Sequence, residues 1–277
     1  MIRRKEIFFR LGLVIALSAT LLALVLPVVA IFIQSGPAEL LASLGRPAAQ
    51  DALVVSLRSA AICLVVVVAF GTPAAYLLAT RRFPGRAAVI TAVELPIVLP
   101  PSVAGIGLLA AFGPHGTLGG TLESLGINLP LTAAAVVIAM VFVSGPLYIR
   151  QAQAAFAALD PRLAHASSVL GVGEARWFGR VAVPLAAPGL GTGATLAFGR
   201  ALGEFGATLM FAGSLQGVTQ TLPIAIFEIF GTDFTAALAM GALLVAVSAA
   251  LLLTVKLLGA RHGAEPAYPH AALSLRS

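Results

Sequence analysis

Charged side chains are scarce in this chain. Asp, Glu, Lys and Arg make up 10% of its 277 residues, whereas hydrophobic residues make up 59%. The mean hydropathy of +1.01 is far above that of a soluble domain of this length. The composition therefore excludes a soluble globular protein and predicts an integral membrane protein. Alternating strands of about ten residues are also missing, so we expect an all-α polytopic protein rather than a barrel.

The scarcity of particular residue types excludes several chemistries. Only two lysines occur, Lys5 and Lys256, and neither is followed by Ser or Thr, so the chain has no G-x-x-x-x-G-K-[ST] phosphate loop and cannot hydrolyse ATP by that motif. No serine lies two residues after a glycine, which excludes a G-x-S-x-G nucleophile. The single cysteine, Cys63, and four dispersed histidines predict neither a disulfide nor a metal site. We expect no catalytic residue, no cofactor and no metal bound by this chain.

Six apolar segments are long enough to cross a hydrocarbon core of about 30 Å. The first is too long for a signal peptide and ends without an A-x-A cleavage site, so we expect it to remain as a membrane helix. The six predicted spans are Ile7–Ile33, Ala52–Ala79, Ala87–Phe112, Leu131–Phe156, Val181–Ala212 and Phe234–Leu258.

Basic residues are distributed unevenly among the connections between these spans. Fourteen of the seventeen Lys and Arg residues lie in the two termini and in the second-to-third and fourth-to-fifth connections. The positive-inside rule then predicts that both termini and residues 160–184 are cytoplasmic. The net charge of +6 is explained by this topology and by contact with anionic membrane lipid, and it does not indicate nucleic-acid binding.

Residues 160–184 form a polar, basic segment between two apolar ones. Asp160 is a good N-cap, Pro161 suits the first helical position and Gly171 is a natural stop, which predicts a short helix. We expect Leu163, Ser167 and Leu170 to share one face of it. These features fit either an interfacial helix lying on lipid or a docking surface for a partner protein.

The spacing within this segment favours the docking surface. Ala166, Gly171 and, after nine residues, Val181, Val183 and Pro184 resemble the E-A-A-x-x-x-G…I-x-L-P signature of ABC importer permeases. His165 stands where that family usually has Glu, and Ser167 where it has the second Ala. The resemblance implies a cytoplasmic coupling helix that inserts into a groove on an ATPase subunit. The coupling residues it implies are Asp160, Leu163, His165, Ala166, Leu170, Gly171 and Pro184.

Further motifs resemble the molybdate branch of the molybdate and sulfate permeases. They are FGRALGEFGATLMFAG (198–213), TQTLPIAI (219–226), RRFPGR (81–86) and ELPIVLPPSVAG (94–105), and the resemblance runs from about Asp51 to Leu258. It implies a six-helix type I importer fold with both termini inside. The expected divisions are an N-terminal helix with an outer loop (1–50), the permease domain (51–260, coupling region 160–184) and a disordered cytoplasmic tail (261–277).

The implied function is the permease subunit of an ATP-driven importer for a tetrahedral oxyanion, molybdate or tungstate. A sulfate or thiosulfate permease is the alternative within the family, while a proton-coupled secondary transporter and a membrane scaffold are remoter ones. The implied partners are a cytoplasmic ATPase dimer that uses ATP and Mg, an extracytoplasmic oxyanion-binding protein and a second copy of this chain. The implied location is the prokaryotic plasma membrane.

Polar residues and helix breaks inside the predicted spans are candidates for the translocation path. Arg200 and Glu204 lie four residues apart in the fifth span, where they can neutralise each other. Both a fixed ion pair between helices and a contact with the transported anion remain open. Prolines interrupt the third span and can line a cavity. The candidate path residues are Pro96, Pro100, Ser102, Arg200, Glu204 and Thr208.

Overall fold

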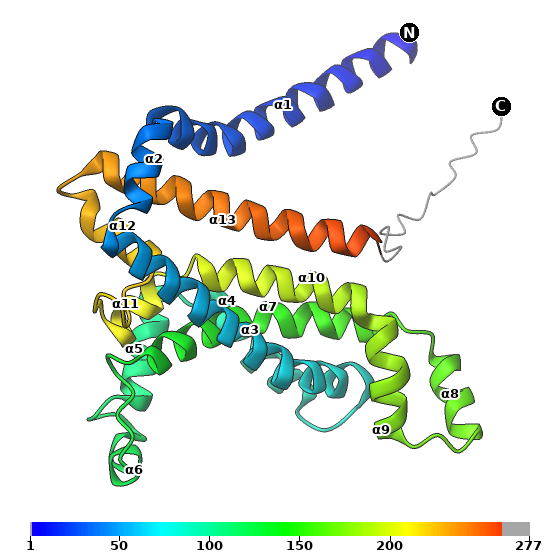
Figure 1. Cartoon of the computed structure of the whole chain (residues 1–277). Helices are drawn as coiled ribbons and strands as arrows, with labels where there is room; N and C mark the ends of the chain where they lie inside the picture. Colours follow the sequence, from blue (N-terminus) through cyan, green and yellow to red (C-terminus); the bar gives the residue numbers. More distant parts are fainter. Residues whose placement is uncertain (1, 262–277) are drawn as a thin grey trace.

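The computed structural model describes residues 2–261, and those residues contain helices and connections but no strand. Figure 1 shows their arrangement. The helices are α1 (Ile2–Gln34), α2 (Pro37–Leu44), α3 (Pro47–Thr80), α4 (Arg86–Val98), α5 (Pro101–Phe112), α6 (Gly119–Ser124), α7 (Ala133–Ala157), α8 (Pro161–Val169), α9 (Glu174–Trp177), the π-helical turn η1 (Phe178–Ala182), α10 (Val183–Leu202), α11 (Gly206–Ala212), α12 (Leu222–Phe230) and α13 (Phe234–Arg261).

Five helical segments are long and apolar enough to cross a membrane. They lie in α1, α3, α7, the continuous stretch from α9 to α10, and α13. The remaining predicted span, Ala87–Phe112, is the third along the chain and is not a straight helix, because the chain bends by 118° between α4 and α5. The all-α membrane fold is therefore confirmed, and one of its six predicted spans is a bent pair.

The bend between α4 and α5 lies at Pro100 and Pro101. Leu99 and Pro100 have extended ψ angles of 134° and 136°, the conformation that a following proline imposes. The predicted interruption is thus confirmed at this pair. It is wrong at Pro96, which lies inside α4.

The fifth predicted span, Val181–Ala212, is also broken, which corrects the expectation of one continuous helix. α10 ends at Leu202 and α11 begins at Gly206. Gly203 and Gly206 flank the break, and glycine is a poor helix former. The Glu204 carboxylate stabilises the break, since Oε1 accepts a hydrogen bond of 2.8 Å from the Ala207 N–H in the first turn of α11.

Helices α3, α7 and α10 form the packed centre of the subunit. Tyr148 of α7 is fully buried there, and its hydroxyl lies 2.6 Å from that of Thr72 on α3. Helices α5 and α11 pack against each other at one end of this centre. By contrast, α1 contacts α13 but leaves its apolar residues uncovered by this chain (Figure 1).

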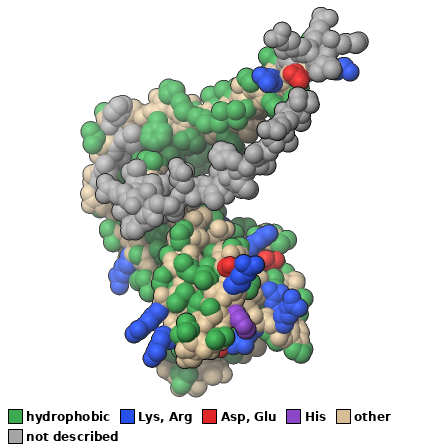
Figure 2. All heavy atoms as spheres, turned by 90° about the vertical axis from the view of Figure 1, so that its right-hand side faces the viewer, with side chains coloured by type: hydrophobic (Ala, Val, Ile, Leu, Met, Phe, Trp, Pro, Cys, Tyr) green, Lys and Arg blue, Asp and Glu red, His purple; other side chains and the backbone are tan. Residues whose placement is uncertain are grey.

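The start of α1, the helix α8 and the end of α13 lie at the same end of the molecule, opposite α2, α6 and the α11–α12 connection (Figure 1). Figure 2 shows the α8 end, where Lys and Arg side chains gather. This arrangement agrees with the predicted grouping of the basic connections on one side. That this side is cytoplasmic stays a prediction, and the predicted tail lies outside the described residues except for Arg261.

Candidate coupling and translocation sites

The helix α8 begins and ends as the sequence predicts. The Asp160 carboxylate accepts a hydrogen bond of 2.8 Å from the Arg162 N–H, and Pro161 follows it at the first helical position. At the other end Gly171 has a φ of +72°, which L-residues with a side chain rarely adopt. The Val172 N–H reaches back to the Ser167 carbonyl at 2.9 Å, which closes a Schellman turn.

The helix α8 buries none of its residues. Leu163 is 45% exposed and Leu170 is 80% exposed, and His165 and Ala166 are exposed as well. Exposed apolar patches at the end of a folded chain are typical of interaction sites. The predicted coupling residues are therefore available to a partner.

A cavity of about 590 Å³ separates α8 from the ends of the long helices. Its α8 side consists of small residues, and its floor is aromatic. Ser167 lines this cavity, whereas Leu163 and Leu170 do not, and the expectation that the three share one face stays a prediction. The α8 side is formed by Pro161, Ala164, Ser167 and Ser168, and the floor by Tyr76, Phe156 and Trp177.

Polar contacts fix the connections around this cavity. Arg81, just after α3, forms an ion pair with Glu174 of α9. Arg86 donates two hydrogen bonds, of 2.8 and 2.6 Å, to the Leu78 carbonyl at the end of α3. These contacts fix the end of α3 and the start of α9 beside the cavity, whereas α8 itself is attached mainly at its two ends.

Pro184 lies where η1 joins α10. A proline has no N–H to donate to the carbonyl four residues earlier, so the regular helical ladder cannot continue through it. The Val183 N–H instead donates to the Phe178 carbonyl five residues earlier, which is the π-helical pattern. The predicted coupling residue Pro184 thus marks the widened turn through which α9 continues into α10.

The candidate path residues lie around the two helix breaks, which meet. A Cβ placed on Gly206 would lie 2.8 Å from the Pro101 Cβ and 3.2 Å from the Ser102 N. The structure therefore brings Pro100 and Ser102 on one break next to the segment containing Glu204 on the other. Pro96 lies away from the bend, within α4.

Two glycines that are not among the candidate path residues form this contact. A Cβ on Gly105 of α5 would lie 2.6 Å from the Met210 Cβ and 2.7 Å from the Ala207 carbonyl oxygen. On α11, Gly206 makes the corresponding close approach to the start of α5. Gly105 lies in the motif at 94–105 and Gly206 in the motif at 198–213, and their place in these motifs was the only indication of a role that the sequence offered. Thr208 of α11 is fully buried, and its hydroxyl has no hydrogen-bond partner among the described residues.

Arg200 and Glu204 form an ion pair across the end of α10. Arg200 Nη1 lies 2.6 Å from Glu204 Oε2, and the side chains are 33% and 1% exposed. The predicted pairing is confirmed, but it spans a helix break rather than one helix face. A buried carboxylate is costly unless it is compensated, and here Arg200 and the Ala207 N–H compensate it.

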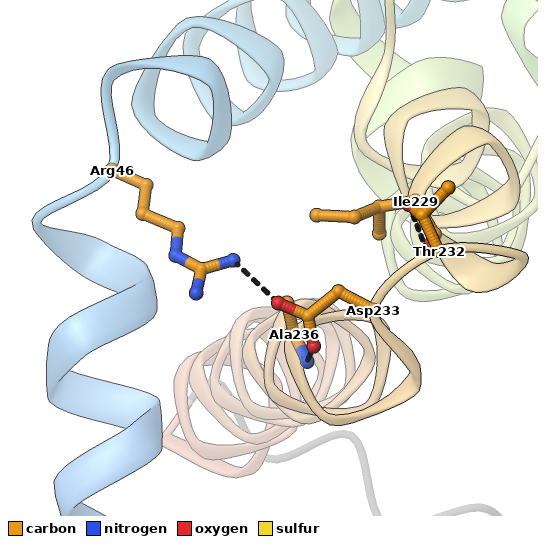
Figure 3. A network of polar contacts seen from close by, with 5 residues as sticks. All are labelled: Arg46, Ile229, Thr232, Asp233 and Ala236. Atoms are coloured by element: carbon orange, nitrogen blue, oxygen red, sulfur yellow. Dashed lines mark hydrogen bonds and ion pairs between the residues drawn. The ribbon is translucent and has the colours of Figure 1, made fainter.

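The end of the molecule opposite α8 carries a second ion pair (Figure 3). Arg46 Nη1, just before α3, lies 3.3 Å from Asp233 Oδ2, just before α13, and both side chains are exposed. The Ala236 N–H donates to Asp233 Oδ1 at 2.9 Å. This hydrogen bond, followed by the hydrogen bond and charge of Arg46, lowers the pKa of Asp233 below its ordinary value.

Sequence comparisons place the chain among transport proteins. Residues 69–262 match the family described as "Binding-protein-dependent transport system inner membrane component". The chain is 42% identical over 230 residues to the molybdenum transport system permease protein ModB of Mycobacterium tuberculosis, covering 83% of this chain and 87% of that protein. It is 33% identical over 243 residues to a "Probable sulfate transport system permease protein cysT" of Chlorokybus atmophyticus, covering 86% and 85%.

Solved structures share the fold. The chain aligns with a TM-score of 0.74 and 15% identity to a bacterial alginate ABC transporter in complex with an alginate pentasaccharide-bound periplasmic protein, covering 94% of this chain and 96% of that one. The TM-score is 0.57, with 17% identity, for the MetNI methionine ABC transporter in an inward-facing conformation, covering 77% and 93%.

The family match covers more than half of the chain, and the fold agrees with it. The two breaks, the exposed α8 and the long apolar helices are consistent with a multi-pass protein of the inner membrane. The chain therefore belongs to the binding-protein-dependent transport system inner membrane components and is a permease subunit of an ABC importer.

Proposed function

We propose that this permease carries a tetrahedral oxyanion, molybdate or tungstate, in an importer driven by ATP. The chain supplies the translocation path by alternating access, and a separate ATPase subunit binds and hydrolyses ATP with Mg. The observation that carries the substrate class is the 42% identity to a molybdenum transport permease over most of both chains. Molybdate and tungstate share charge and shape, so one site accommodates both.

Sulfate is the second candidate. The 33% identity to a sulfate transport permease extends over a similar share of the chain. Sulfate is also a tetrahedral dianion, and it differs from molybdate mainly in size. Competition between the two anions is therefore the natural test of the substrate.

The coupling role is assigned to α8. Its exposed apolar residues, Leu163 and Leu170, would enter a groove of the ATPase, and His165 and Ala166 lie on the same short helix. Asp160 and Gly171 define where the helix starts and stops, and Pro184 marks the turn that leads into α10. Closure of an ATPase dimer would then move α8 and the helices joined to it as a rigid body.

A second copy of this chain would complete the path. An ATPase dimer offers two grooves, and each permease subunit has one α8. The face of α10 that carries Gly191 and Gly199 supports the dimer, because a Cβ on either glycine would meet no atom within 4 Å. Small residues at such a face allow close approach of another helix in a membrane.

The end opposite α8 would receive the oxyanion-binding protein. The α5–α7 connection and the α11–α12 connection lie there (Figure 1). Pro100, Ser102, Arg200, Glu204 and Thr208 are proposed to lie along the path inward from this end, with Pro96 further along α4. Lipid surrounds the remaining apolar surface.

The test is ATP-dependent uptake of labelled molybdate into proteoliposomes that contain this chain, its ATPase and its binding protein. Uptake that persists in excess sulfate supports molybdate or tungstate. Uptake erased by equimolar sulfate assigns the protein to sulfate. Absence of ATP-dependent uptake of all three anions by an assembled complex contradicts the proposal.

A further inference from the structure

Arg200 makes an ionic contact with Glu204 without donating a hydrogen bond to it. Nη1 and Oε2 are only 2.6 Å apart, yet no N–H of the guanidinium is directed at the oxygen with hydrogen-bond geometry, so Oε2 lacks a donor within residues 2–261. Buried polar atoms usually have such partners. Among the described residues, Arg200 therefore pairs with Glu204 by charge and not by a hydrogen bond.

Two other arginines of the chain, Arg86 and Arg46, use their donors within the protein. Arg86 donates from Nε and Nη2 to the Leu78 carbonyl, and Arg46 donates from Nη1 to Asp233. Arg200 has the ion pair with Glu204 as its one polar contact in the part of the chain that the structure describes. Its planar fork of donors remains open, and this fork suits an oxyanion.

Glu204, by contrast, is held in place. It is 1% exposed, and its other oxygen, Oε1, accepts the Ala207 N–H at the start of α11. Arg200 is 33% exposed and lies in the last turn of α10, just before the break. The acid is thus a fixed buried charge, and the base faces space that this chain leaves open.

We propose that Arg200 is a transit contact for the oxyanion and that Glu204 is the fixed counter-charge that keeps this contact weak. The inference rests on the proposed function as an oxyanion permease. Arg200 is the residue of the pair that meets the substrate. Glu204 is a positioning residue, since it acts on the substrate only through Arg200.

The pair explains how one site can accept an anion and release it. A lone arginine in a poorly hydrated path would bind a dianion tightly and stall transport, because conduction requires binding that is weak enough to reverse. Glu204 cancels the net charge of the site but leaves the donors of Arg200 free. The anion is then recognised by hydrogen bonds without being trapped by charge.

The first experiment measures labelled molybdate bound by the purified complex of permease and ATPase, without the binding protein. Glu204→Gln leaves Arg200 without a counter-charge, so we expect the complex to bind molybdate about tenfold more tightly or better, with a gain that shrinks at high salt. An unchanged affinity in a complex that assembles normally overturns the proposal.

The second experiment uses a neutral pair, Arg200→Gln with Glu204→Gln. Two amides can hydrogen-bond across the break and leave the net charge unchanged, so a purely structural pair is replaced with little loss. A transit contact is removed, and we expect ATP-dependent molybdate uptake to fall about tenfold or more while the complex still assembles. Uptake near that of the wild-type complex overturns the proposal.

Two further variants keep these outcomes interpretable. Glu94→Gln with Arg150→Gln makes the same chemical change at an exposed Arg–Glu pair, with 3.8 Å between Arg150 Nε and Glu94 Oε1, and should leave uptake within about twofold of the wild type. Arg200→Lys, made with Glu204 intact, keeps the charge of the pair and serves as the test if the neutral pair assembles poorly. We expect it to retain part of the wild-type uptake, and a loss as complete as in the neutral pair overturns the proposal.

Uptake by the wild-type complex distinguishes a failure of the proposed function from a failure of the role proposed for Arg200. Failure of the wild type to take up molybdate, tungstate or sulfate contradicts the proposed function itself. Normal wild-type uptake combined with an unaffected neutral pair contradicts only the role given to Arg200.

Discussion

The α8 end and the helix-break region of this permease are packed in opposite ways. The helix α8 buries no residue and lies over a cavity of about 590 Å³. At the breaks, α5 and α11 approach so closely that a Cβ on Gly105 would lie 2.6 Å from another side chain. One region is attached through its ends, and the other through backbone contact.

This difference indicates that the α5–α11 contact is rigid, whereas α8 is free to bind a partner protein. Close packing transmits displacement, because a well-packed interface resists compression. A helix with exposed apolar residues instead gains its packing from a partner. The comparison predicts that changes at α8 impair coupling with little loss of stability, whereas changes at α5 and α11 destabilise the subunit.

The largest effect is expected for Gly171→Pro. Its φ of +72° is inaccessible to proline, whose ring fixes φ near −65°, so the Schellman turn after α8 cannot form. We expect ATPase activity in the complete complex to lose its stimulation by loaded binding protein. The thermal midpoint of the permease should stay close to that of the wild type, because α8 buries nothing.

Gly173→Ala is the matched control for this change. Gly173 has a φ of −62°, and a Cβ there meets no atom within 4 Å, so alanine fits the existing backbone. The control should retain stimulation. Full stimulation in the Gly171→Pro complex would contradict the coupling role of α8, and a large drop in its thermal midpoint would contradict the comparison.

Gly105→Ala is expected to have the largest effect on stability. The new Cβ would lie 2.7 Å from the backbone oxygen of Ala207, which cannot move without shifting α11. We expect a loss of about 1–3 kcal/mol, the usual range for overpacking. Thermal unfolding of the purified subunit in detergent measures it.

Gly107→Ala in the same helix should be neutral or slightly stabilising. A Cβ at Gly107 meets no atom within 4 Å, and alanine favours helix over glycine. Equal midpoints for the two alanine variants would mean that α5 and α11 do not pack as closely as the structure indicates.

The sequence predicted α8 well because local chemistry determines both of its ends. Asp160, Pro161 and Gly171 each act within a few residues, and their spacing alone defines a short helix. The cavity face of α8 could not be predicted in this way. Ser167 lies at a helical spacing from Leu163, but the ends of α3 and α7 decide which side is hollow.

The two breaks were predicted less completely. Pro100 and Pro101 indicated the first, but Pro96 remained helical, since a proline can be accommodated within a membrane helix. The second break has no proline. It depends on Glu204 reaching the Ala207 N–H and on Gly206 meeting Pro101, and contacts with α5 cannot be read from the hydrophobicity of Val181–Ala212.

A smaller effect is expected for Asp160→Ala. The substitution removes the hydrogen bond to the Arg162 N–H and should cost the helix about 1 kcal/mol. Because α8 can fold when it docks, we expect reduced stimulation of the ATPase rather than its loss. Asp160→Asn retains a capping oxygen and should behave like the wild type, and equal defects in both variants would point to the charge of Asp160 instead of its cap.

The smallest effects are expected at the Arg46–Asp233 pair, which belongs to neither of the compared regions and provides a baseline for both (Figure 3). The pKa of Asp233 is lowered in the folded protein, so its contribution to stability is present above the ordinary carboxyl pKa and is lost as the pH falls through the lowered pKa. Asp233→Asn should remove this pH-dependent contribution, so its thermal midpoint should approach that of the wild type as the pH falls from about 6 to about 3. Arg46→Gln should remove only part of it, because the Ala236 N–H, the largest single cause of the shift, remains. An Arg46→Gln midpoint that matches that of Asp233→Asn at every pH would contradict this expectation, because the ion pair would then account for the whole contribution of Asp233 and the backbone hydrogen bond for none of it.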